Sequence, residues 1–170
     1  MSQSEILTKL LQDEKYTEII NSGIKNVAFD MTNNPNAKTI FTNSKLVKYF
    51  IDNNIDIILT YNNWKLIHYV CRYSINSPEG INIIKYIIDM YLEKNYKIDY
   101  ITNDGWAPIH FICRYAPNTP EGIGLVKYIF NIYKEHNLNE KQKTYQQLTP
   151  MWYYEMSDKS VFDLLDIQQD

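Results

Sequence analysis

The sequence predicts an all-α protein built from stacked helix pairs, and three observations carry that prediction. Residues Trp64–Tyr73 are repeated as Trp106–Tyr115, at a constant step of 42 residues. A strong helix-start signal follows each copy, and apolar residues then recur three and four positions apart. Repetition at a step of a few tens of residues is typical of stacked supersecondary units. Such stacks usually offer a binding surface rather than a reaction centre.

Composition supports a folded chain and excludes several classes of function. The 170 residues are 45% hydrophobic, enough to bury a core and too apolar for disorder. The net charge of −3 gives no general attraction to nucleic acid. We see neither a secretory signal nor an apolar run of the ~18–20 residues that cross a bilayer. Stacked units would hold the two cysteines roughly 10 Å apart, too far for a disulfide, which favours a reducing, intracellular setting.

The better copy shows the order of elements within one unit. Pro108 suits the first turn of a helix that follows the turn 103–105 and runs to Tyr115. A loop over 116–119 leads to Thr119-Pro120, an N-cap followed by proline at the first helical position. A second helix then continues through Tyr133, and the earlier copy repeats the pattern with Ser77 as its cap. The unit is therefore turn, helix, loop, helix.

Flanking segments predict further helices. Leu46–Asp52 parallels Ile83–Asp89 at a shorter step of 37, which indicates the second helix of a degenerate first unit. Residues 4–22 have the apolar spacing of one or two amphipathic helices, and Lys25–Met31 is expected to form another short helix. Lys159–Ile167 is expected to close the stack as a final helix, because arrays need polar-faced end units.

The repeated unit resembles an ankyrin repeat. Gly105–His110 matches the family pattern Gly-x-Thr-Pro-Leu-His, with Ala107 where Thr is usual. Leu148–Trp152 lies one step later and keeps Thr-Pro, with Trp in place of His. The first copy departs further, with Lys65-Leu66 in place of Thr-Pro. This form is similar to the long-loop arrays of AT-rich protists and of large DNA viruses of amoebae.

The resemblance implies an ankyrin-repeat solenoid of helix-turn-helix units with helical end caps. The usual ankyrin step is about 33 residues, so each unit here carries about nine more. The expected organisation is one domain over 1–170. Its parts are an N-terminal helical cap at 1–39, a degenerate repeat at about 40–60, repeats at 61–102 and 103–144, and a C-terminal capping repeat at 145–170.

The repeated His-x-x-Cys does not predict a metal site or a catalytic site. Structural zinc needs four ligands around one ion, whereas His68/Cys71 and His110/Cys113 belong to successive parallel helices. We expect each imidazole to bond the backbone of the turn and each Cys to fill a buried slot. A buried thiol lacks the activating surroundings of a nucleophile, and no phosphate loop or hydrolase motif is present. The sequence therefore predicts no enzyme, no cofactor and no metal.

Two tryptophans and two arginines are the candidates for partner contact. Trp64 and Trp106 either face a partner from the concave side or pack over the adjoining unit. Arg72 and Arg114 are the chain's two arginines among 17 basic residues, which suggests a need for the planar guanidinium. That need is either a partner's or internal, through helix-end carbonyls, Glu79 or Glu121, or stacking on a tyrosine.

The leading hypothesis is a non-enzymatic module that binds a protein partner in the cytoplasm, or in the host cytoplasm if the protein is viral. The alternatives are self-association as a homodimer and nucleic-acid binding through aromatic stacking, the latter disfavoured by the acidic balance. The expected contact surface comprises the turns and the exposed face of the first helices, extended by Gln146 and Leu148: Tyr61, Asn62, Trp64, Arg72, Tyr73, Asn103, Asp104, Trp106, Arg114 and Tyr115.

Overall fold

A computed structural model describes residues 41–53, 56–57, 63–157 and 159, together with the isolated positions 5, 9, 15 and 26–27. Of the helices predicted over 4–22, only three positions are described, and Glu5 and Lys9 among them are helical. Lys159 is not helical, and the rest of the helix predicted over Lys159–Ile167 lies outside the described residues. Tyr61 and Asn62 also lie outside them.

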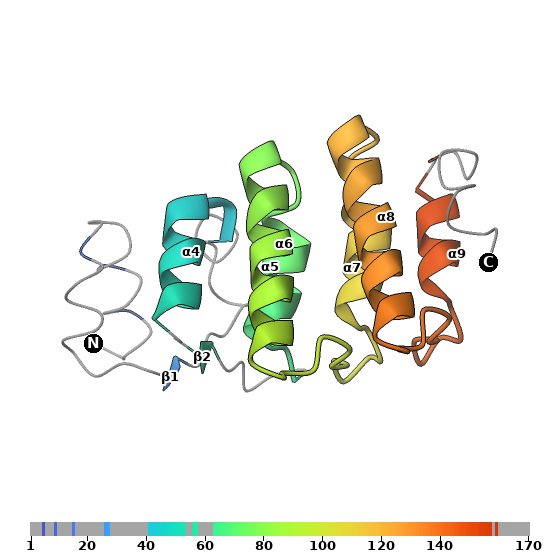
Figure 1. Cartoon of the computed structure of the whole chain (residues 1–170), viewed down its shortest axis with the longest axis horizontal. Helices are drawn as coiled ribbons and strands as arrows, with labels where there is room; N and C mark the ends of the chain where they lie inside the picture. The colour runs from blue at the N-terminus through green and yellow to red at the C-terminus, as the bar shows by residue number, and fades with distance from the viewer. Residues whose placement is uncertain are drawn as a thin grey trace.

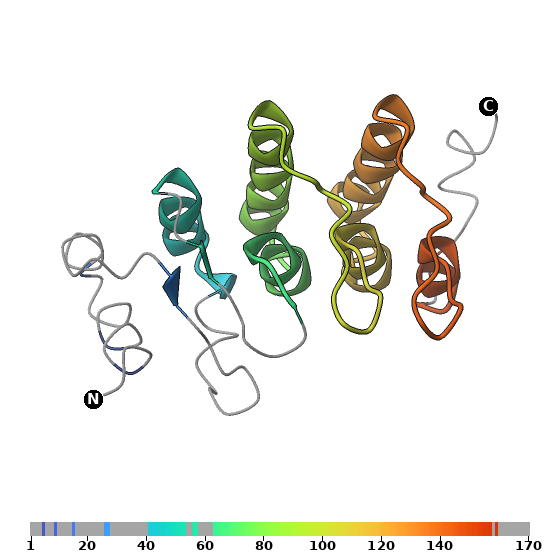
Figure 2. The same ribbon diagram turned by 90° about the horizontal axis from the view of Figure 1, so that it is seen from below.

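The described chain is helical, and its helices form two layers (Figures 1 and 2). One layer holds α5, α7 and α9 side by side, and the other holds α4, α6 and α8. Each long helix of the second layer packs against the short helix that precedes it in the chain. The helices span Ser44–Asp52 (α4), Leu66–Tyr73 (α5), Pro78–Glu93 (α6), Pro108–Tyr115 (α7), Pro120–Glu135 (α8) and Pro150–Glu155 (α9).

The helix starts predicted from the sequence are confirmed. The Ser77 and Thr119 hydroxyls accept hydrogen bonds from the backbone N–H groups of Gly80 and Gly122, at 3.0 and 3.2 Å. Thr149 caps α9 in the same way. In each case proline occupies the first helical turn, where a backbone N–H would have no partner within the helix, so its absence costs no hydrogen bond. The bounds of α5 and α6 recur in α7 and α8 at the step of 42.

Helix α4 lies in the same layer as the long helices α6 and α8. It packs against α6, in the layer of long helices. The Tyr86 hydroxyl of α6 donates a 2.6 Å hydrogen bond to the Asp52 carboxylate at the end of α4. Tyr128 of α8 makes the same bond to Asp89 of α6. A repeated tyrosine–aspartate bond therefore joins neighbouring members of this layer.

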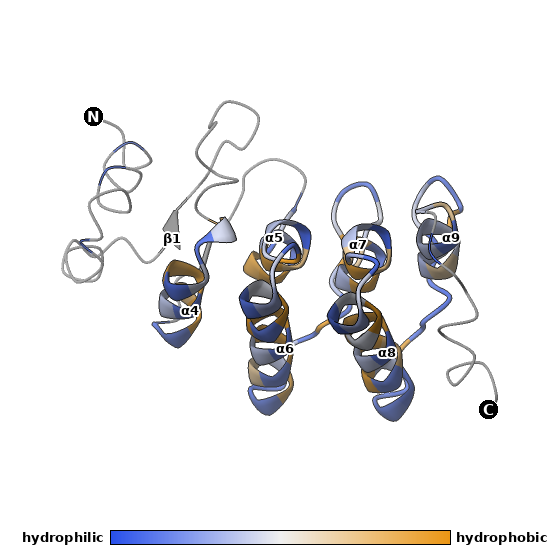
Figure 3. Cartoon of the chain, turned by 90° about the horizontal axis from the view of Figure 1, so that it is seen from above, coloured by the Kyte–Doolittle hydropathy of each residue, from blue (hydrophilic) through white to orange (hydrophobic). Residues whose placement is uncertain are grey.

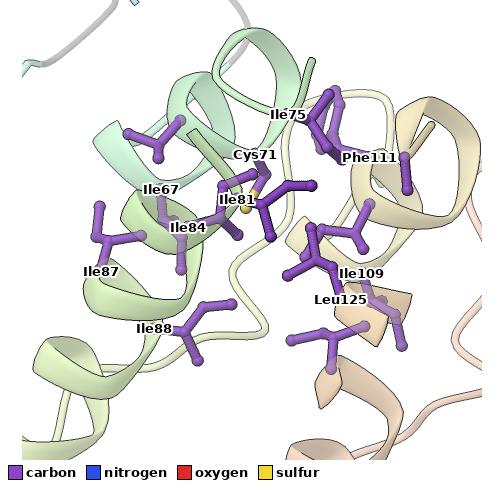
Figure 4. Packing of buried hydrophobic residues seen from close by; sticks show 14 of the residues in the cluster. Ile67, Cys71, Ile75, Ile81, Ile84, Ile87, Ile88, Ile109, Phe111 and Leu125 are labelled. Carbon is purple, nitrogen blue, oxygen red and sulfur yellow. The ribbon is translucent and has the colours of Figure 1, made fainter. Parts of the chain in front are cut away.

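The core lies between the two layers and is rich in isoleucine. Figure 3 shows the apolar sides of the helices facing one another and their polar sides facing outward. Ile67, Ile84 and Ile109 are fully buried there, in contact with the rest of one continuous cluster (Figure 4). Cys71 belongs to the same cluster, so it fills a core position as the sequence analysis expected.

Left-handed backbone recurs at the same step as the sequence. Asn63, Gly105 and Gln147 have φ of 56°, 80° and 65°, and they follow one another at intervals of 42 residues. Asn95 and Asn137, at the ends of the long helices, form a second such pair with φ of 54° each. Glycine and asparagine tolerate this conformation best. The turns therefore repeat in backbone conformation even where the side chains differ.

One expectation for the N-terminal region is wrong. Residues 26–27, predicted within a short helix over Lys25–Met31 and within a helical cap, form strand β1 (Asn26–Val27) instead. This strand pairs in parallel with β2 (Asp56–Ile57), thirty residues further along. Backbone hydrogen bonds to a distant segment thus override the local helical spacing of apolar residues.

None of the described helices combines the length and the apolar character that crossing a membrane requires.

The Pro-Glu-Gly corners place each glycine directly against the loop before it. A Cβ atom added to Gly80 would lie 1.6 Å from the Ser74 carbonyl oxygen, and one added to Gly122 would lie 2.0 Å from that of Pro117. By contrast, a Cβ at Gly124, two residues further along α8, would meet nothing within 4 Å. Close contact with the loop therefore requires glycine at position 122, whereas no such contact requires it at position 124.

We predict opposite effects of alanine at these two glycines. Gly122→Ala forces the loop away from α8 and should lower the free energy of unfolding by about 1–3 kcal/mol. Gly124→Ala removes a flexible residue from a helix interior and should raise it by about 0.5–1 kcal/mol. Thermal denaturation followed by circular dichroism measures both. Shifts of the same sign in the two variants would contradict the close approach at Gly122.

Candidate functional site

Two buried histidines join each helix pair to the segment that leads into the next one. The His68 Nδ1 atom accepts a hydrogen bond from the Lys65 backbone N–H at 2.8 Å, and its Nε2 atom lies 2.9 Å from the Tyr100 carbonyl oxygen. His110 repeats this with the Ala107 N–H at 3.0 Å and the Gln142 carbonyl at 2.9 Å. Because Nδ1 accepts, the network assigns the proton to Nε2, which donates to the carbonyl.

Both ring nitrogens of each imidazole are hydrogen-bonded, and the rings are uncharged. Burial lowers the pKa of His68 to about 4 and also lowers the pKa of His110. With both ring nitrogens bonded, neither imidazole has a lone pair left for a metal ion or for proton abstraction. Burial also raises the pKa of the Cys71 and Cys113 thiols, which disfavours the thiolate. Within the described part of the chain, His, Cys, Asp and Glu do not gather into any group of three or more suited to a metal.

Aromatic rings connect the first helices across the stack. Trp64 packs on Tyr69 of its own unit and on Phe111 of the next, with ring centroids 4.8 Å apart in both pairs. Trp106 repeats the pattern with Phe111 at 5.0 Å and Tyr153 at 4.4 Å. Both tryptophans remain half-buried. Of the two interpretations left open by the sequence, packing on the adjoining unit is therefore present, and part of each tryptophan remains accessible to solvent.

The arginines lie against tyrosine rings, and no acidic residue in the described part of the chain forms an ion pair with either of them. The Arg72 guanidinium carbon lies 3.6 Å from the ring centroid of Tyr115, on the following unit. Arg114 lies 5.6 Å from Tyr153 and 5.7 Å from Tyr115, and its side chain is exposed. Of the internal roles considered for these arginines, stacking on a tyrosine is the one the structure shows.

The carbonyl end of α7 is covered by Ser157 and Lys159, the second of which is the first residue of the helix predicted over Lys159–Ile167. Lys159 is buried, and its Nζ atom donates to the carbonyl oxygens of Cys113 and Arg114 at 2.8 and 3.3 Å. Ser157 adds a hydroxyl bond to the Arg114 carbonyl. Burial lowers the pKa of the Lys159 ammonium to about 8. A cation at this end of α7 also complements the helix dipole.

A groove lies between α5 and α7, and we call it the α5–α7 groove. Its volume is about 330 Å³, at the lower end of the range for ligand pockets. Thr102, whose hydroxyl accepts a hydrogen bond from the Trp106 N–H at 3.2 Å, lies on its wall. The other lining residues are aromatic or charged: Trp64, Trp106, Phe111, Tyr115, Arg72 and Asp104.

Five of the residues predicted for partner contact line this groove: Trp64, Arg72, Asp104, Trp106 and Tyr115. The structure places three others elsewhere. Tyr73 faces the preceding unit, with its ring stacked on Phe41 and Tyr69. Asn103 is exposed at the turn, and Arg114 lies one unit further along.

Sequence reasoning did not select Phe111 and Thr102 for the site. Phe111 was predicted as part of a helix core, yet it lies between the two tryptophans. The recurrence of an aromatic residue at 69, 111 and 153 could have identified it. Thr102 has a counterpart in Thr144, whose hydroxyl accepts from the Leu148 N–H at 3.4 Å.

Comparison with known proteins adds no assignment, because no protein-family model and no curated protein matches this chain.

The buried imidazoles predict a loss of stability on mild acidification. Each is neutral in the folded protein but takes a proton near pH 6.5 when unfolded. The contribution of His68 is therefore complete above about pH 6.5 and falls as pH decreases toward 4, by up to about 1.4 kcal/mol for each pH unit. The lowered pKa of His110 adds a loss in the same direction below about pH 6.5. Urea denaturation at pH 7, 6 and 5 measures this.

A histidine variant separates this effect from that of the acidic residues. His110→Gln should be less stable at pH 7, since the buried Ala107 N–H and the partly buried Gln142 carbonyl lose the imidazole as partner. Its stability should also depend less steeply on pH between 7 and 5. An unchanged slope in this variant would exclude His110 as a source of the pH dependence.

Proposed function

We propose that this protein is a non-enzymatic protein-binding module, an ankyrin-repeat solenoid that holds its partner against the turns and first helices. The single observation that carries the proposal is the α5–α7 groove, where two half-buried tryptophans, an arginine and an aspartate from two successive units meet. Tryptophan and arginine dominate the binding energy of protein interfaces. The resemblance of Gly105–His110 to the ankyrin pattern supports the fold assignment.

The state of the chemical groups favours binding over catalysis. Both thiols are buried with raised pKa, and both buried imidazoles are bonded at each ring nitrogen. Two free cysteines in the core also suit the reducing interior of a cell, where we place the protein.

The proposal predicts that the arginines are needed for partner capture. The tagged chain would capture proteins from an extract of its native cells, and mass spectrometry would quantify them. Arg72→Ala/Arg114→Ala should reduce recovery of the specific partners at least about tenfold, equivalent to about 1.4 kcal/mol. The matched control Lys94→Ala/Lys97→Ala, at the far end of α6, removes the same charge and should leave recovery unchanged. Equal recovery by wild type and by the arginine variant, with both folded, would refute the proposal.

Self-association is the second candidate, because the last described helix exposes apolar side chains. Trp152 and Met156 are 37% and 61% exposed. If they form an interface between two copies, light scattering should show a molar mass that rises with concentration toward twice that of the chain. Trp152→Ser should then return the chain to a monomer. A constant monomer mass over the micromolar range would exclude this candidate.

A further inference from the structure

The α5–α7 groove is charged at its two ends and aromatic between them. Asp104 lies in the turn before α7, at the end where both short helices begin. Arg72 lies in the last turn of α5, at the opposite end. The axis of α5 from Leu66 to Arg72 is about 9 Å long, which sets the scale of the separation between the two ends of the groove. An extended peptide covers that distance in about three residues.

Arg72 is held in a position to bind a carboxylate. Its guanidinium carbon lies 3.6 Å from the Tyr115 ring centroid, so the ring contact restricts the position of the group without using its N–H donors in an ion pair. The side chain is half-buried, and no described residue forms an ion pair with it. A planar guanidinium with open N–H groups matches a carboxylate in bidentate geometry.

Asp104 supplies the opposite charge at the other end. Its backbone carbonyl accepts a hydrogen bond from the Tyr145 N–H at 3.1 Å, which holds the turn against the next unit. Its side chain is exposed, and none of the described cations pairs with it. A basic group that reaches this end of the groove would therefore meet an open carboxylate.

The middle of the groove favours one large apolar side chain. Phe111 is buried between Trp64 and Trp106, so the two half-buried indoles provide the contact surface and Phe111 supports them from below. The volume of about 330 Å³ equals that of about ten water molecules, which leaves room for one aromatic side chain and the adjoining backbone. Aromatic pairs contribute attraction beyond the area they bury.

We infer that the α5–α7 groove selects an extended peptide segment of a partner protein, with a basic side chain at the Asp104 end, an aromatic side chain at the tryptophans and an acidic side chain at Arg72. The two charged side chains lie about three residues apart. The opposite charges of the groove disfavour a polyanion such as a nucleic acid, since Asp104 repels phosphate. This inference rests on the proposed function and names the chemistry of its partner.

Selection from a random library tests the inference directly. Displayed 12-residue peptides would be selected against the immobilised full chain and against Arg72→Glu, Asp104→Lys and the double variant. The wild type should enrich peptides with the basic, aromatic and acidic pattern. Arg72→Glu should lose the acidic position, and the double variant should enrich the charges in reversed order. Lys97→Glu, a charge reversal away from the groove, should select the wild-type pattern.

Binding measurements make the outcome quantitative. A fluorescent peptide selected by the wild type should bind Arg72→Glu and Asp104→Lys at least tenfold more weakly, and Lys97→Glu equally well. Circular dichroism would establish that each variant is folded, and Arg72→Gln and Asp104→Asn replace any variant that is not. Enrichment without a charge pattern, or the same peptides from wild type and Arg72→Glu, would overturn the inference. So would the absence of any enriched peptide.

Failure of this inference can be distinguished from failure of the proposed function. If the native partner depends on Arg72 and Arg114 but the selected peptides show no charge pattern, the binding function stands and the peptide chemistry is wrong. If the peptides show the pattern but native capture ignores the arginines, the groove is selective and the proposed use of it is wrong.

Discussion

A buried, neutral imidazole holds the spacing between successive helix pairs, and the rest of the structure depends on that bridge. His68 and His110 each bond the backbone at the start of their own helix and a carbonyl 32 residues further on. Without the ring, an N–H and a carbonyl would lose their partners, at up to about 3 kcal/mol for a fully buried group and less for the partly buried ones. The bridge also fixes the approach to the next turn, where Trp106 and Asp104 are placed. The groove therefore exists because the bridge sets where the next unit begins.

The residues that join the units are also the residues that form the candidate binding surface. Phe111 is buried between two indoles, and Arg72 on one unit covers Tyr115 on the next. The contacts of Trp64 with Phe111 and of Arg72 with Tyr115 cross a unit boundary, and Trp64, Arg72 and Tyr115 remain partly accessible to solvent. Such a surface is pre-organised, because its side chains are already held in place before a partner arrives. A partner would then bind at little cost in side-chain ordering.

The sequence predicts local features well, because they depend on neighbouring residues. The step of 42 places α5 through α8 and the start of α9, and the caps at Ser77 and Thr119 follow from their own tripeptides. Contacts between distant segments are different. Pairing of β1 with β2, the bond from Lys159 to the end of α7 and the stacking of Arg72 on Tyr115 depend on the three-dimensional arrangement. For the site, the repeat identified the tryptophans and the arginine but could not show that Tyr73 faces the other way.

Nitrogen-15 NMR of the histidine rings tests the imidazole bridge most directly, since long-range correlations show which ring nitrogen carries the proton. At pH 7 the bridge predicts a single tautomer for both His68 and His110, with the proton on Nε2 and an unprotonated Nδ1 that accepts a hydrogen bond. A proton on Nδ1, a mixture of tautomers or a charged ring at either histidine would contradict the bridge and the unit spacing that depends on it.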